Sequence, residues 1–513
     1  MKYIKAIASF FLSFCILCSC GGNGADNGST ETNGSGVTEK VPAGSYNPEG
    51  NEIDVKKYGA AGDGTGDDTA AVNAALEKAK ETGGILYFPE GVYRLTESVA
   101  VNSDVSVAFA DGAVINTEKT FRVTTVVIAG NHRIFGEGNF KCILRNEYVN
   151  PMWFGAVGDG VTDDTAAFEK ALESGSSLGV PFTAGGFAVG GLNLKKSAVI
   201  TGIPSENGER ARLVGIKNRD MFTFSTYDIS ISGFDIDMSD SGKAAVFFYD
   251  TSAAGKSGYH LYDIDITGAY RVIRDAAVIT NYVINSLVEN VNCYAGRGTA
   301  FDLRCFWGFV FFRDLVIDYT ETAEKYGIKP DFPAVILENN AGCVFQRMKI
   351  VGDGNKSNGN AHAFQYRNDI ATWMDGCEFL NITGNCVNVS GASSHLYFSN
   401  LKSSGCIGDA FSFTTVIFLQ VHGLEISGGR NGIMLNQCNG AQITGCDITG
   451  VTGDGILNYT SNGTSVVGCS VSQCGGRGYS ESSAMGSAIV DCIFTDCRGG
   501  GLIIGQKSGA VSG

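Results

Sequence analysis

The fold of this chain is decided by three short triplets, Cys446-Asp447-Ile448, Cys469-Ser470-Val471 and Cys492-Ile493-Phe494, which stand 23 residues apart. In each triplet two apolar residues flank one residue of variable character. Because side chains alternate between the two faces of a β-strand, the first and third residues point to the same side. A strand pattern that returns every 23 residues or so is typical of a solenoid of stacked coils.

The same triplet can be followed back through most of the chain. The first inward position is held by Phe234, Ile264, Val291, Leu315, Met348, Cys377, Leu401 and Leu424. The second inward position is held by Ile236, Ile266, Cys293, Ile317, Ile350, Phe379, Ser403 and Ile426. Only Ser403 among these is polar, so the sequence predicts an all-β chain folded as a parallel β-helix.

A second feature, a Gly-rich turn followed by a strand residue, repeats with the coils. It occurs at Phe301, Val335, Phe364, Val387, Phe411, Ile433, Ile456, Tyr479 and Leu502. In most coils it lies 9 or 10 residues after the first inward residue. In the two adjacent coils that begin at Leu315 and Met348, the distance is 20 and 16 residues. These coils carry extra loops, 319–332 and 352–361. We expect the two loops to form one wall of a groove; surface variation without a function is the alternative.

A motif rich in glycine and aspartate precedes the repeats and occurs twice. Tyr58-Gly-Ala-Ala-Gly-Asp-Gly-Thr-Gly-Asp-Asp-Thr-Ala-Ala71 returns 96 residues later as Phe154-Gly-Ala-Val-Gly-Asp-Gly-Val-Thr-Asp-Asp-Thr-Ala-Ala167. Apolar residues follow each copy at helical spacing. We expect a tight turn and then a short helix, with Asp68 or Asp164 capping the first amide groups of the helix.

The first copy continues as GGILYFPEGVY over residues 83–93, which predicts a strand, a turn and a strand. This whole string resembles the opening segment of the pectate-lyase-like superfamily, which phage tailspike depolymerases and some β-1,3-glucanases share. The resemblance implies a right-handed parallel β-helix with short N-terminal capping helices. The second copy is followed by Val180-Pro-Phe-Thr183 and lacks the Phe-Pro-x-Gly continuation.

The first twenty residues have the pattern of a signal peptide. Two lysines precede an apolar run over residues 7–17, which is too short for an ordinary membrane-spanning helix. The sequence Leu17-Cys-Ser-Cys20-Gly resembles the lipobox of bacterial lipoproteins, which implies that Cys20 is acylated and anchors the protein to a membrane. Ordinary signal cleavage nearby is the alternative.

Four segments follow from these patterns. Residues 1–20 are predicted to be a lipoprotein signal peptide, and residues 21–50, which are rich in Gly, Asn, Ser and Thr, a flexible tether. Residues 51–150 are predicted to hold the first capping helix and the initial coils, and residues 151–513 the main β-helix, which begins with the second motif. The predicted location is the bacterial envelope, with the lipid anchor in the outer membrane.

Composition narrows the function only by exclusion. The 513 residues carry a net charge of −15, which argues against a nucleic-acid partner, and 70 glycines with only 8 prolines indicate many tight turns. Several of the 16 cysteines fall in the inward column, where a thiol behaves as a small buried hydrophobe. Cys474 and Cys497 should stack on adjacent coils; we expect reduced thiols, with a disulfide as the alternative. No zinc spacing is present, so no structural metal is expected.

A polar column two residues before the second feature is the candidate site. It contains His362, Asn385, Asp409, Asn431, Asp454 and Arg477. Asp409 and Asp454 lie two coils apart, which corresponds to about 9.6 Å at the usual strand spacing. Inverting glycoside hydrolases hold their two carboxyls about 6.5–9.5 Å apart. The column therefore predicts Asp409 and Asp454 as a catalytic pair; either can serve as acid or base, and we assign the acid role to Asp454.

The remaining polar side chains are predicted to bind substrate. Arg430 and Arg477 suit carboxylates by bidentate contact, and Trp373 suits a sugar ring by stacking. His362 is expected to bind substrate carboxylates or hydroxyls, and Asn385 and Asn431 are expected to bind substrate. The predicted partner is a polysaccharide, pectin-like or otherwise uronate-containing, whose glycosidic bonds the protein hydrolyses.

Three alternatives remain open at this point. Asn, Asp and Gly are the residues that β-helix turns need for their own backbone. The paired Asp-Asp and the Gly-His-Gly of polygalacturonase-type hydrolases are absent. The second alternative is therefore a lyase, with an Arg base and with Ca²⁺ bound by Asp409 and Asp454. Apart from this Ca²⁺, no cofactor is expected. The third is a non-catalytic carbohydrate-binding or adhesion protein.

The last predicted coil runs from Cys492 to Gly513 with no helix to cover it. An uncovered strand edge invites pairing with another chain. We therefore expect either a homo-oligomer formed through this coil or a truncated reading frame.

Overall fold

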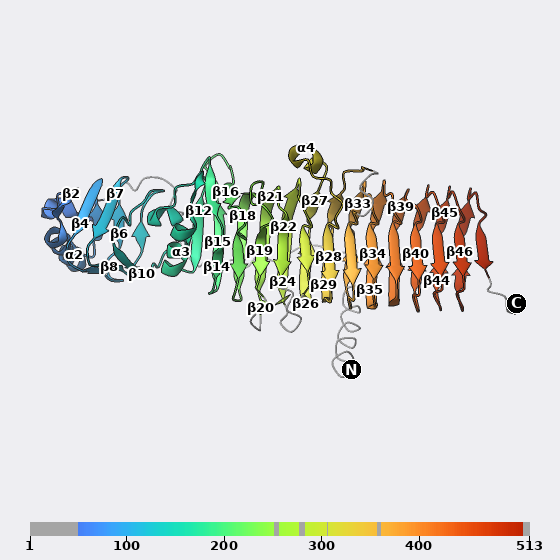
Figure 1. Ribbon diagram of the computed structural model, residues 1–513. Helices are drawn as coiled ribbons and strands as arrows, with labels where there is room; N and C mark the ends of the chain where they lie inside the picture. The colour runs from blue at the N-terminus through green and yellow to red at the C-terminus, as the bar shows by residue number, and fades with distance from the viewer. Residues whose placement is uncertain (1–49, 251–255, 276–282, 305, 356–360, 506–513) are drawn as a thin grey trace, which may run out of the picture. The chain divides into compact units, whose positions relative to one another are not determined.

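The computed structural model describes residues 50–250, 256–275, 283–304, 306–355 and 361–505 (Figure 1). The chain separates into two compact units, Met1–Pro42 and Ala43–Gly513, and the described residues all belong to the second. The predicted signal peptide, Cys20 and nearly all of the tether lie outside the described residues. Within the described part of the chain, no helix is long and apolar enough to cross a membrane.

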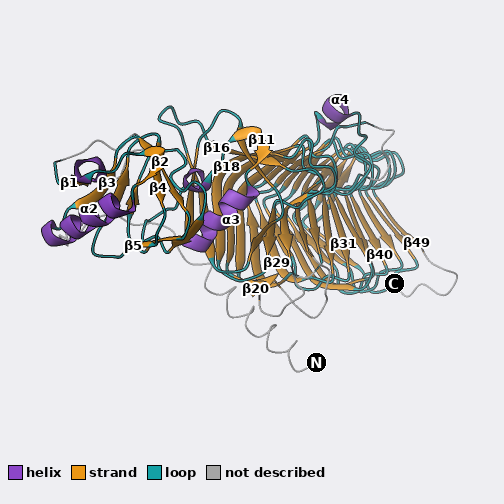
Figure 2. Ribbon diagram, turned by 60° about the vertical axis from the view of Figure 1, so that its left-hand side comes forward, coloured by secondary structure: helices purple, strands orange, loops and turns teal. Residues whose placement is uncertain are grey.

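Helices are few, and two of them follow the duplicated motif. The helical segments are η1 (Val55–Tyr58), α2 (Thr69–Thr82), η2 (Pro151–Phe154), α3 (Thr165–Ser174) and α4 (Thr322–Tyr326). In α2 the buried residues Val72, Leu76 and Ala79 recur every three or four positions, as one helical face requires. The predicted short helices of the N-terminal part are therefore confirmed (Figure 2).

The expected capping by Asp68 and Asp164 is wrong. Neither carboxylate caps its helix; each turns back and accepts hydrogen bonds from amides of the glycine-rich turn. Asp68 Oδ1 lies 2.6 Å from the amide nitrogen of Ala61, and Asp164 Oδ1 lies 2.7 Å from that of Val157. Both aspartates are buried, and the buried amides of the turn have no strand partner there. These amides therefore need the carboxylates as acceptors, and the carboxylates bind them instead of the first amides of the helix.

The first described coils form three small parallel sheets. One sheet contains β1 (Glu52–Asp54), β3 (Ile85–Phe88), β6 (Val107–Phe109) and β9 (Val127–Ile128). The second contains β2 (Asp63–Asp67), β4 (Gly91–Leu95) and β7 (Ala113–Thr117). The third contains β5 (Val99–Val101), β8 (Thr120–Val123) and β10 (Asn139–Cys142). These strands precede the second copy of the motif.

The main coils build two long parallel sheets. The 13-stranded sheet takes one strand from each coil: β14 (Leu192–Leu194), β17 (Phe222–Phe224), β19 (Ala245–Tyr249), β22 (Arg271–Asp275), β25 (Phe301–Leu303), β28 (Val335–Glu338), β31 (Phe364–Arg367), β34 (Val387–Ser390), β37 (Phe411–Thr414), β40 (Ile433–Asn436), β43 (Ile456–Tyr459), β46 (Tyr479–Ser482) and β49 (Leu502–Gly505). A two-stranded sheet, β20 (Lys256–Ser257) and β23 (Val283–Ile284), lies outside both long sheets in the strand pairing.

The 24-stranded sheet receives two strand segments from most coils. Its strands are β11 (Asp159–Asp163), β12 (Ser177–Pro181), β13 (Gly186–Val189), β15 (Ala198–Ile203), β16 (Ala211–Gly215), β18 (Ile229–Asp237), β21 (Tyr259–Thr267), β24 (Ser286–Tyr294), β26 (Trp307–Arg313), β27 (Val316–Asp318), β29 (Ala341–Gln346), β30 (Lys349–Val351), β32 (Trp373–Asp375), β33 (Glu378–Leu380), β35 (Ser393–Ser399), β36 (Lys402–Ser404), β38 (Val416–His422), β39 (Glu425–Ser427), β41 (Gln442–Thr444), β42 (Asp447–Thr449), β44 (Ser465–Val467), β45 (Ser470–Ser472), β47 (Ala488–Val490) and β48 (Ile493–Thr495).

Strand register confirms the repeat read from the sequence. Ile350 pairs with Phe379, Phe379 with Ser403, and Ser403 with Ile426, and the same column continues to Phe494. The second feature is also in register, from Phe301 through to Leu502. The all-β, parallel β-helix prediction is therefore confirmed.

Burial explains why the pattern was so regular. Inward residues of successive coils stack on one another in a continuous apolar core, which removes them from water. Cysteines of the inward column take part as buried thiols, and burial raises the pKa of Cys377 to about 12. All twelve cysteines in the described residues, Cys474 and Cys497 included, carry free thiols.

The last described coil is less well covered than the others. Strands β48 and β49 each pair with a neighbour on one side only. Ile504 is 60% exposed, whereas the equivalent residues on the preceding coils, Glu481, Asn458 and Leu435, are buried. Association of two chains through this edge stays a prediction.

Candidate functional site

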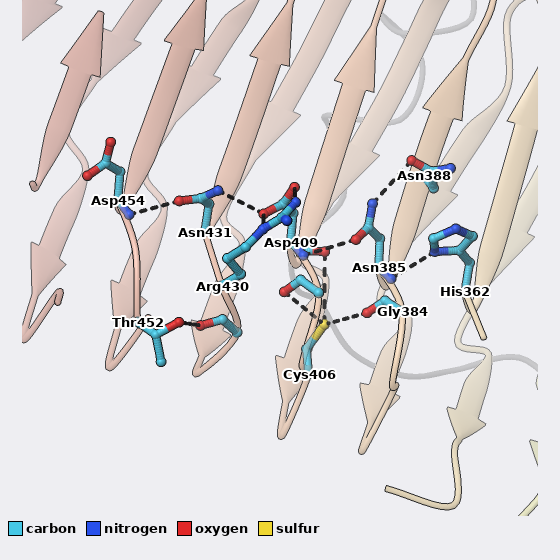
Figure 3. A network of polar contacts seen from close by, with 12 residues as sticks. His362, Gly384, Asn385, Asn388, Cys406, Asp409, Arg430, Asn431, Thr452 and Asp454 are labelled. Atoms are coloured by element: carbon cyan, nitrogen blue, oxygen red, sulfur yellow. Dashed lines mark hydrogen bonds and ion pairs between the residues drawn. The ribbon is translucent and has the colours of Figure 1, made fainter. Parts of the chain in front are cut away.

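The predicted polar column lies in the turn that leads from the 24-stranded sheet into the 13-stranded one. Each member stands two residues before a strand of the smaller sheet: β31, β34, β37, β40, β43 or β46. The structure therefore brings His362, Asn385, Asp409, Asn431, Asp454 and Arg477 together as one line on successive coils. Figure 3 shows the first five of them.

Hydrogen bonds join this line into a ladder. His362 Nδ1 accepts from the amide of Asn385 at 2.8 Å, and Asn385 Oδ1 accepts from the amide of Asp409 at 2.9 Å. Asn431 Oδ1 accepts from the amide of Asp454 at 2.8 Å, and Asp454 Oδ1 accepts from that of Arg477 at 2.7 Å. Each of these side chains thus satisfies a backbone amide of the next coil, which is what a turn in a stacked structure requires.

Asp409 is the most enclosed member of the column. It is 1% exposed, and Arg430 holds it by two contacts, Nε to Oδ1 at 2.8 Å and Nη2 to Oδ2 at 2.6 Å. Asn431 Nδ2 donates a third hydrogen bond to Oδ1 at 2.8 Å. This two-point ion pair raises the pKa of the exposed Arg430. Arg430 thus already pairs with Asp409, and its contact with a substrate stays a prediction.

Asp454 is half-buried and has its own partners. Its Oδ1 is taken by the amide of Arg477, and its Oδ2 accepts from the hydroxyl of Ser480. The side chain of Asn431 bridges the intervening coil, with one end on Asp409 and the other on the amide of Asp454. The side-chain amide of Asn431 therefore spans the interval between the two carboxylates, where a hydrolytic water would have to lie. The catalytic roles of Asp409 and Asp454 stay predictions.

Calcium binding by the two carboxylates stays a prediction. Arg430 already neutralises Asp409, and the amides and hydroxyls described above use the oxygens that a cation would need. Among the described residues, no group of three or more His, Cys, Asp or Glu side chains is arranged to hold a metal ion.

The inserted loops meet beside His362. A small space of about 10 Å³ lies between Tyr319 and Phe332 on one loop and Asp353 on the other, with His362 on its wall. This volume suits a single water molecule rather than a sugar. Desolvation lowers the pKa of His362, so its imidazole is neutral, with Nδ1 as the acceptor described above. The groove formed by the two loops stays a prediction.

Trp373, the remaining predicted binding residue, is not part of the column. It lies on β32 in the 24-stranded sheet, where strand pairing places it in line with neighbours on other coils. This line, the outer row, consists of Phe311, Val344, Trp373, Tyr397, Gln420 and Gln442. The indole of Trp373 and the ring of Tyr397 are stacked, with centroids 5.3 Å apart and planes 29° from parallel.

A shallow concavity opens over this part of the row. Its volume is about 310 Å³. It is lined by Trp373, Tyr397, Phe398, Ser399, Gln420, Val421, His422, Gln442 and Thr444. Gln420 and Gln442 are exposed, and His422 Nδ1 lies 2.9 Å from the hydroxyl of Thr444. An aromatic pair beside amide and hydroxyl groups is the arrangement that holds a flat, polar-edged ligand.

Sequence reasoning selected Trp373 but missed Tyr397, Gln420 and Gln442. A signal for them was present: every member of the outer row stands four residues before the first inward residue of its coil. Trp373 precedes Cys377 by four positions, as Tyr397 precedes Leu401. Extending the repeat backwards by one strand segment would have found the row.

A charged cluster on the 13-stranded sheet was also missed. Asp302 is 7% exposed and contacts Arg304 Nε at 2.8 Å and Arg271 Nε at 3.3 Å. Arg304 also lies near Glu338, and Arg274 pairs with Asp220. The charges of this cluster compensate one another within the fold.

The coil geometry defines a parallel β-helix, and two parts of the chain match family models of that fold. More particularly, residues 52–142 match the family model described as rhamnogalacturonase A/epimerase, pectate lyase-like, and residues 362–512 match the one described as right-handed β-helix region. The resemblance inferred from the duplicated motif and the repeat is therefore confirmed.

Individual relatives match shorter parts of the chain. The preneck appendage protein of Bacillus phage PZA is 51% identical over 83 residues, which is 15% of this chain and 10% of that protein. The plasmin and fibronectin-binding protein A of Streptococcus pneumoniae is 28% identical over 170 residues, 32% of this chain and 22% of that protein. The chain thus spans only a small share of the curated relatives that it matches.

Among solved structures, the A-module of the mannuronan C-5 epimerase AlgE4 from Azotobacter vinelandii is similar to this chain. The alignment covers 90% of this chain and 100% of that module, with 14% identity and a TM-score of 0.22.

Proposed function

We propose that this protein binds a polysaccharide through the concavity over Trp373 and Tyr397. The observation that carries the proposal is the stacked aromatic pair beside exposed glutamines on a regular sheet face. Sugar rings present an apolar face and hydroxyl edges, which match an aromatic surface and amide groups respectively. A rigid sheet holds these groups in place without the entropy cost of ordering a loop.

The chemistry of the polar column supports binding ahead of catalysis. Asp409 is enclosed and ion-paired, whereas a general acid or base must reach the proton that it transfers. The names of relatives add a carbohydrate context: the family model for residues 52–142 is named after rhamnogalacturonase A and an epimerase. Glycosidic-bond hydrolysis or elimination stays a second proposal, to be tested in the same experiment.

The predicted anchor sets where this binding would occur. If Cys20 is acylated as its lipobox implies, the β-helix would be held at the bacterial envelope by a lipid, within reach of extracellular or periplasmic glycans. The envelope location is part of the proposal and rests on the sequence alone.

The test combines binding and turnover. Purified protein is incubated with a panel of polysaccharides; retention is followed by affinity electrophoresis, and products by reducing ends and absorbance at 235 nm. We expect Trp373→Ala to weaken binding about 10- to 100-fold, since a stacked ring contributes roughly 1–3 kcal/mol by its buried area and ring contacts.

The control replaces an aromatic residue elsewhere. Tyr459 lies on β43 of the other sheet and is 51% exposed, so Tyr459→Ala should bind as the wild type does. Equal loss in both variants, or full binding by Trp373→Ala, would remove the concavity from consideration. Reducing ends, alone or with 235 nm absorbance, would establish a hydrolase or a lyase instead of a binding protein.

A further inference from the structure

The concavity over Trp373 carries no formal charge. None of the residues that line it is Asp, Glu, Lys or Arg. Its polar groups are amides, hydroxyls and the His422 imidazole, all of which can bind sugar hydroxyls. A site for uronate carboxylates would ordinarily present an arginine or lysine, because a carboxylate loses its hydration on binding and needs a charged or N–H partner.

The charge that borders the concavity is negative. Asp375 is in register with Ser399 on the next coil and accepts from its hydroxyl at 2.6 Å and from Asn400 Nδ2 at 2.9 Å. Among the described residues, Asp375 forms no ion pair within salt-bridge distance. It therefore presents its charge to anything that lies over Trp373 and Tyr397.

The cations nearby are already engaged. Arg347, whose charge acts on Asp375 only at longer range, is held by both carboxylate oxygens of Asp314 at 2.6 and 2.7 Å. Lys402, on the adjoining sheet segment, pairs with Glu425 at 2.8 Å. In the part of the chain that the structure describes, an anionic sugar at the concavity would thus meet Asp375 while Arg347 and Lys402 are held by other carboxylates.

We infer that the concavity selects uncharged sugar residues of a linear glycan and excludes uronates. The inference rests on the proposed function, which it makes more specific, and it departs from the uronate-containing substrate expected from the sequence. Neutral rings can stack on Trp373 and Tyr397 while their hydroxyls bind Gln420 and Gln442.

The outer row also sets the direction of the glycan. Trp373, Tyr397, Gln420 and Gln442 occupy four successive coils in register, so they span three strand spacings, or about 14 Å. That length exceeds one sugar ring. The glycan therefore lies along the stack of coils, across the strands, and longer oligosaccharides bind more tightly until the row is filled.

The experiment uses matched ligands that differ only in charge. Each neutral polysaccharide of a panel, such as a galactomannan or a mixed-linkage glucan, is compared with its own C6-oxidised form, in which primary alcohols have become carboxylates. Binding to the full chain is measured at pH 8 by affinity electrophoresis and calorimetry. For any polymer that binds, we expect the neutral form to bind at least tenfold more tightly than the oxidised form.

Two substitutions should change this preference in a stated direction. Gln420→Lys adds a cation on the row and should strengthen binding of the oxidised polymer several-fold. Asp375→Asn removes the repulsion and should narrow the gap between the two forms. Because Gln420 is exposed and Asp375 is only half-buried, both variants are expected to fold, which thermal unfolding will verify.

The outcomes separate the inference from the proposed function. Tighter binding of oxidised polymer, abolished by Trp373→Ala, would overturn the inference and keep the function. Binding that survives Trp373→Ala, or no binding to any polymer of either kind, would overturn the function itself. Equal affinity for a disaccharide and a hexasaccharide would contradict the direction assigned to the glycan.

Discussion

The polar column and the outer row are both lines of side chains along the coils, yet they differ in what their polar groups bind. In the column, Asn385, Asp409, Asn431 and Asp454 bind amides and side chains of adjacent coils. In the row, the rings stack and the glutamine amides face solvent. The difference teaches that residue types capable of chemistry define a site only where the fold leaves them unsatisfied.

The energetic roles should differ accordingly. A buried carboxylate with three hydrogen bonds contributes to stability, and its loss leaves amide and guanidinium groups without partners. A half-exposed ring on a sheet face contributes little to folding and much to a ligand that covers it. Substitutions in the two lines should therefore move two different measurements.

Asp409→Ala is expected to have the largest effect. It removes the two-point contact with Arg430 and the hydrogen bond from Asn431 inside a buried turn, at a cost of about 3 kcal/mol in the free energy of unfolding. Chemical denaturation will measure this loss, and glycan binding by the folded variant should be unchanged. Unaltered stability together with lost turnover would restore Asp409 to the catalytic role predicted from the sequence.

Asp369 sharpens the comparison. It lies outside the polar column, and like Asp409 it is a buried carboxylate that accepts a hydrogen bond from another coil, but it has no ion-pair partner among the described residues. Its Oδ1 accepts from the amide of Asn340 at 2.8 Å, its Oδ2 has no hydrogen-bond partner in the described structure, and burial raises its pKa to about 8. The folded state therefore keeps a proton that the unfolded chain releases near pH 4. Stability from this group is complete below about pH 4 and is lost as pH rises to about 8.

Asp369→Asn should remove that dependence. We expect the variant to gain about 5 kcal/mol relative to the wild type between pH 4 and pH 8, at about 1.4 kcal/mol per pKa unit, because an amide does not ionise. Denaturation curves at both pH values will measure the gain, with Asp409→Asn as a control, since its carboxylate faces Arg430. A difference between variant and wild type that is the same at pH 4 and pH 8 would contradict a raised pKa at Asp369.

Lys402→Ala should have the smallest effect. Lys349, Glu378, Lys402 and Glu425 alternate in sign on successive coils, and they form exposed pairs at 3.4 and 2.8 Å. Water and salt screen such pairs, so we expect no measurable change in Tm or in glycan binding. A clear loss of binding would show that the glycan-binding face extends onto this segment.

The sequence predicted the fold in detail because every coil buries the same positions. Every inward residue except Ser403 is apolar, so the register from Phe234 to Cys492 could be read directly and proved right. Turn chemistry was less readable. Whether an aspartate in a turn binds its own backbone, a neighbouring arginine or a substrate depends on geometry that residue order does not contain.

The candidate site was predicted only in part for the same reason. Trp373 was selected by its residue type, but its neighbours on the row lie 24, 47 and 69 residues away and are ordinary in composition. Asp68 shows the same limit on a smaller scale: its place before a helix suggested a cap, whereas the glycine-rich turn supplied closer donors.

The constant register has a consequence for how such a protein can change over time. Because each coil adds one residue to every line, gaining or losing a complete 23-residue unit would lengthen or shorten the binding face while every inward contact finds an equivalent partner. Reach along a glycan can then vary in whole steps, independently of which sugar each step prefers. A shift of a single residue, by contrast, would turn the core outward.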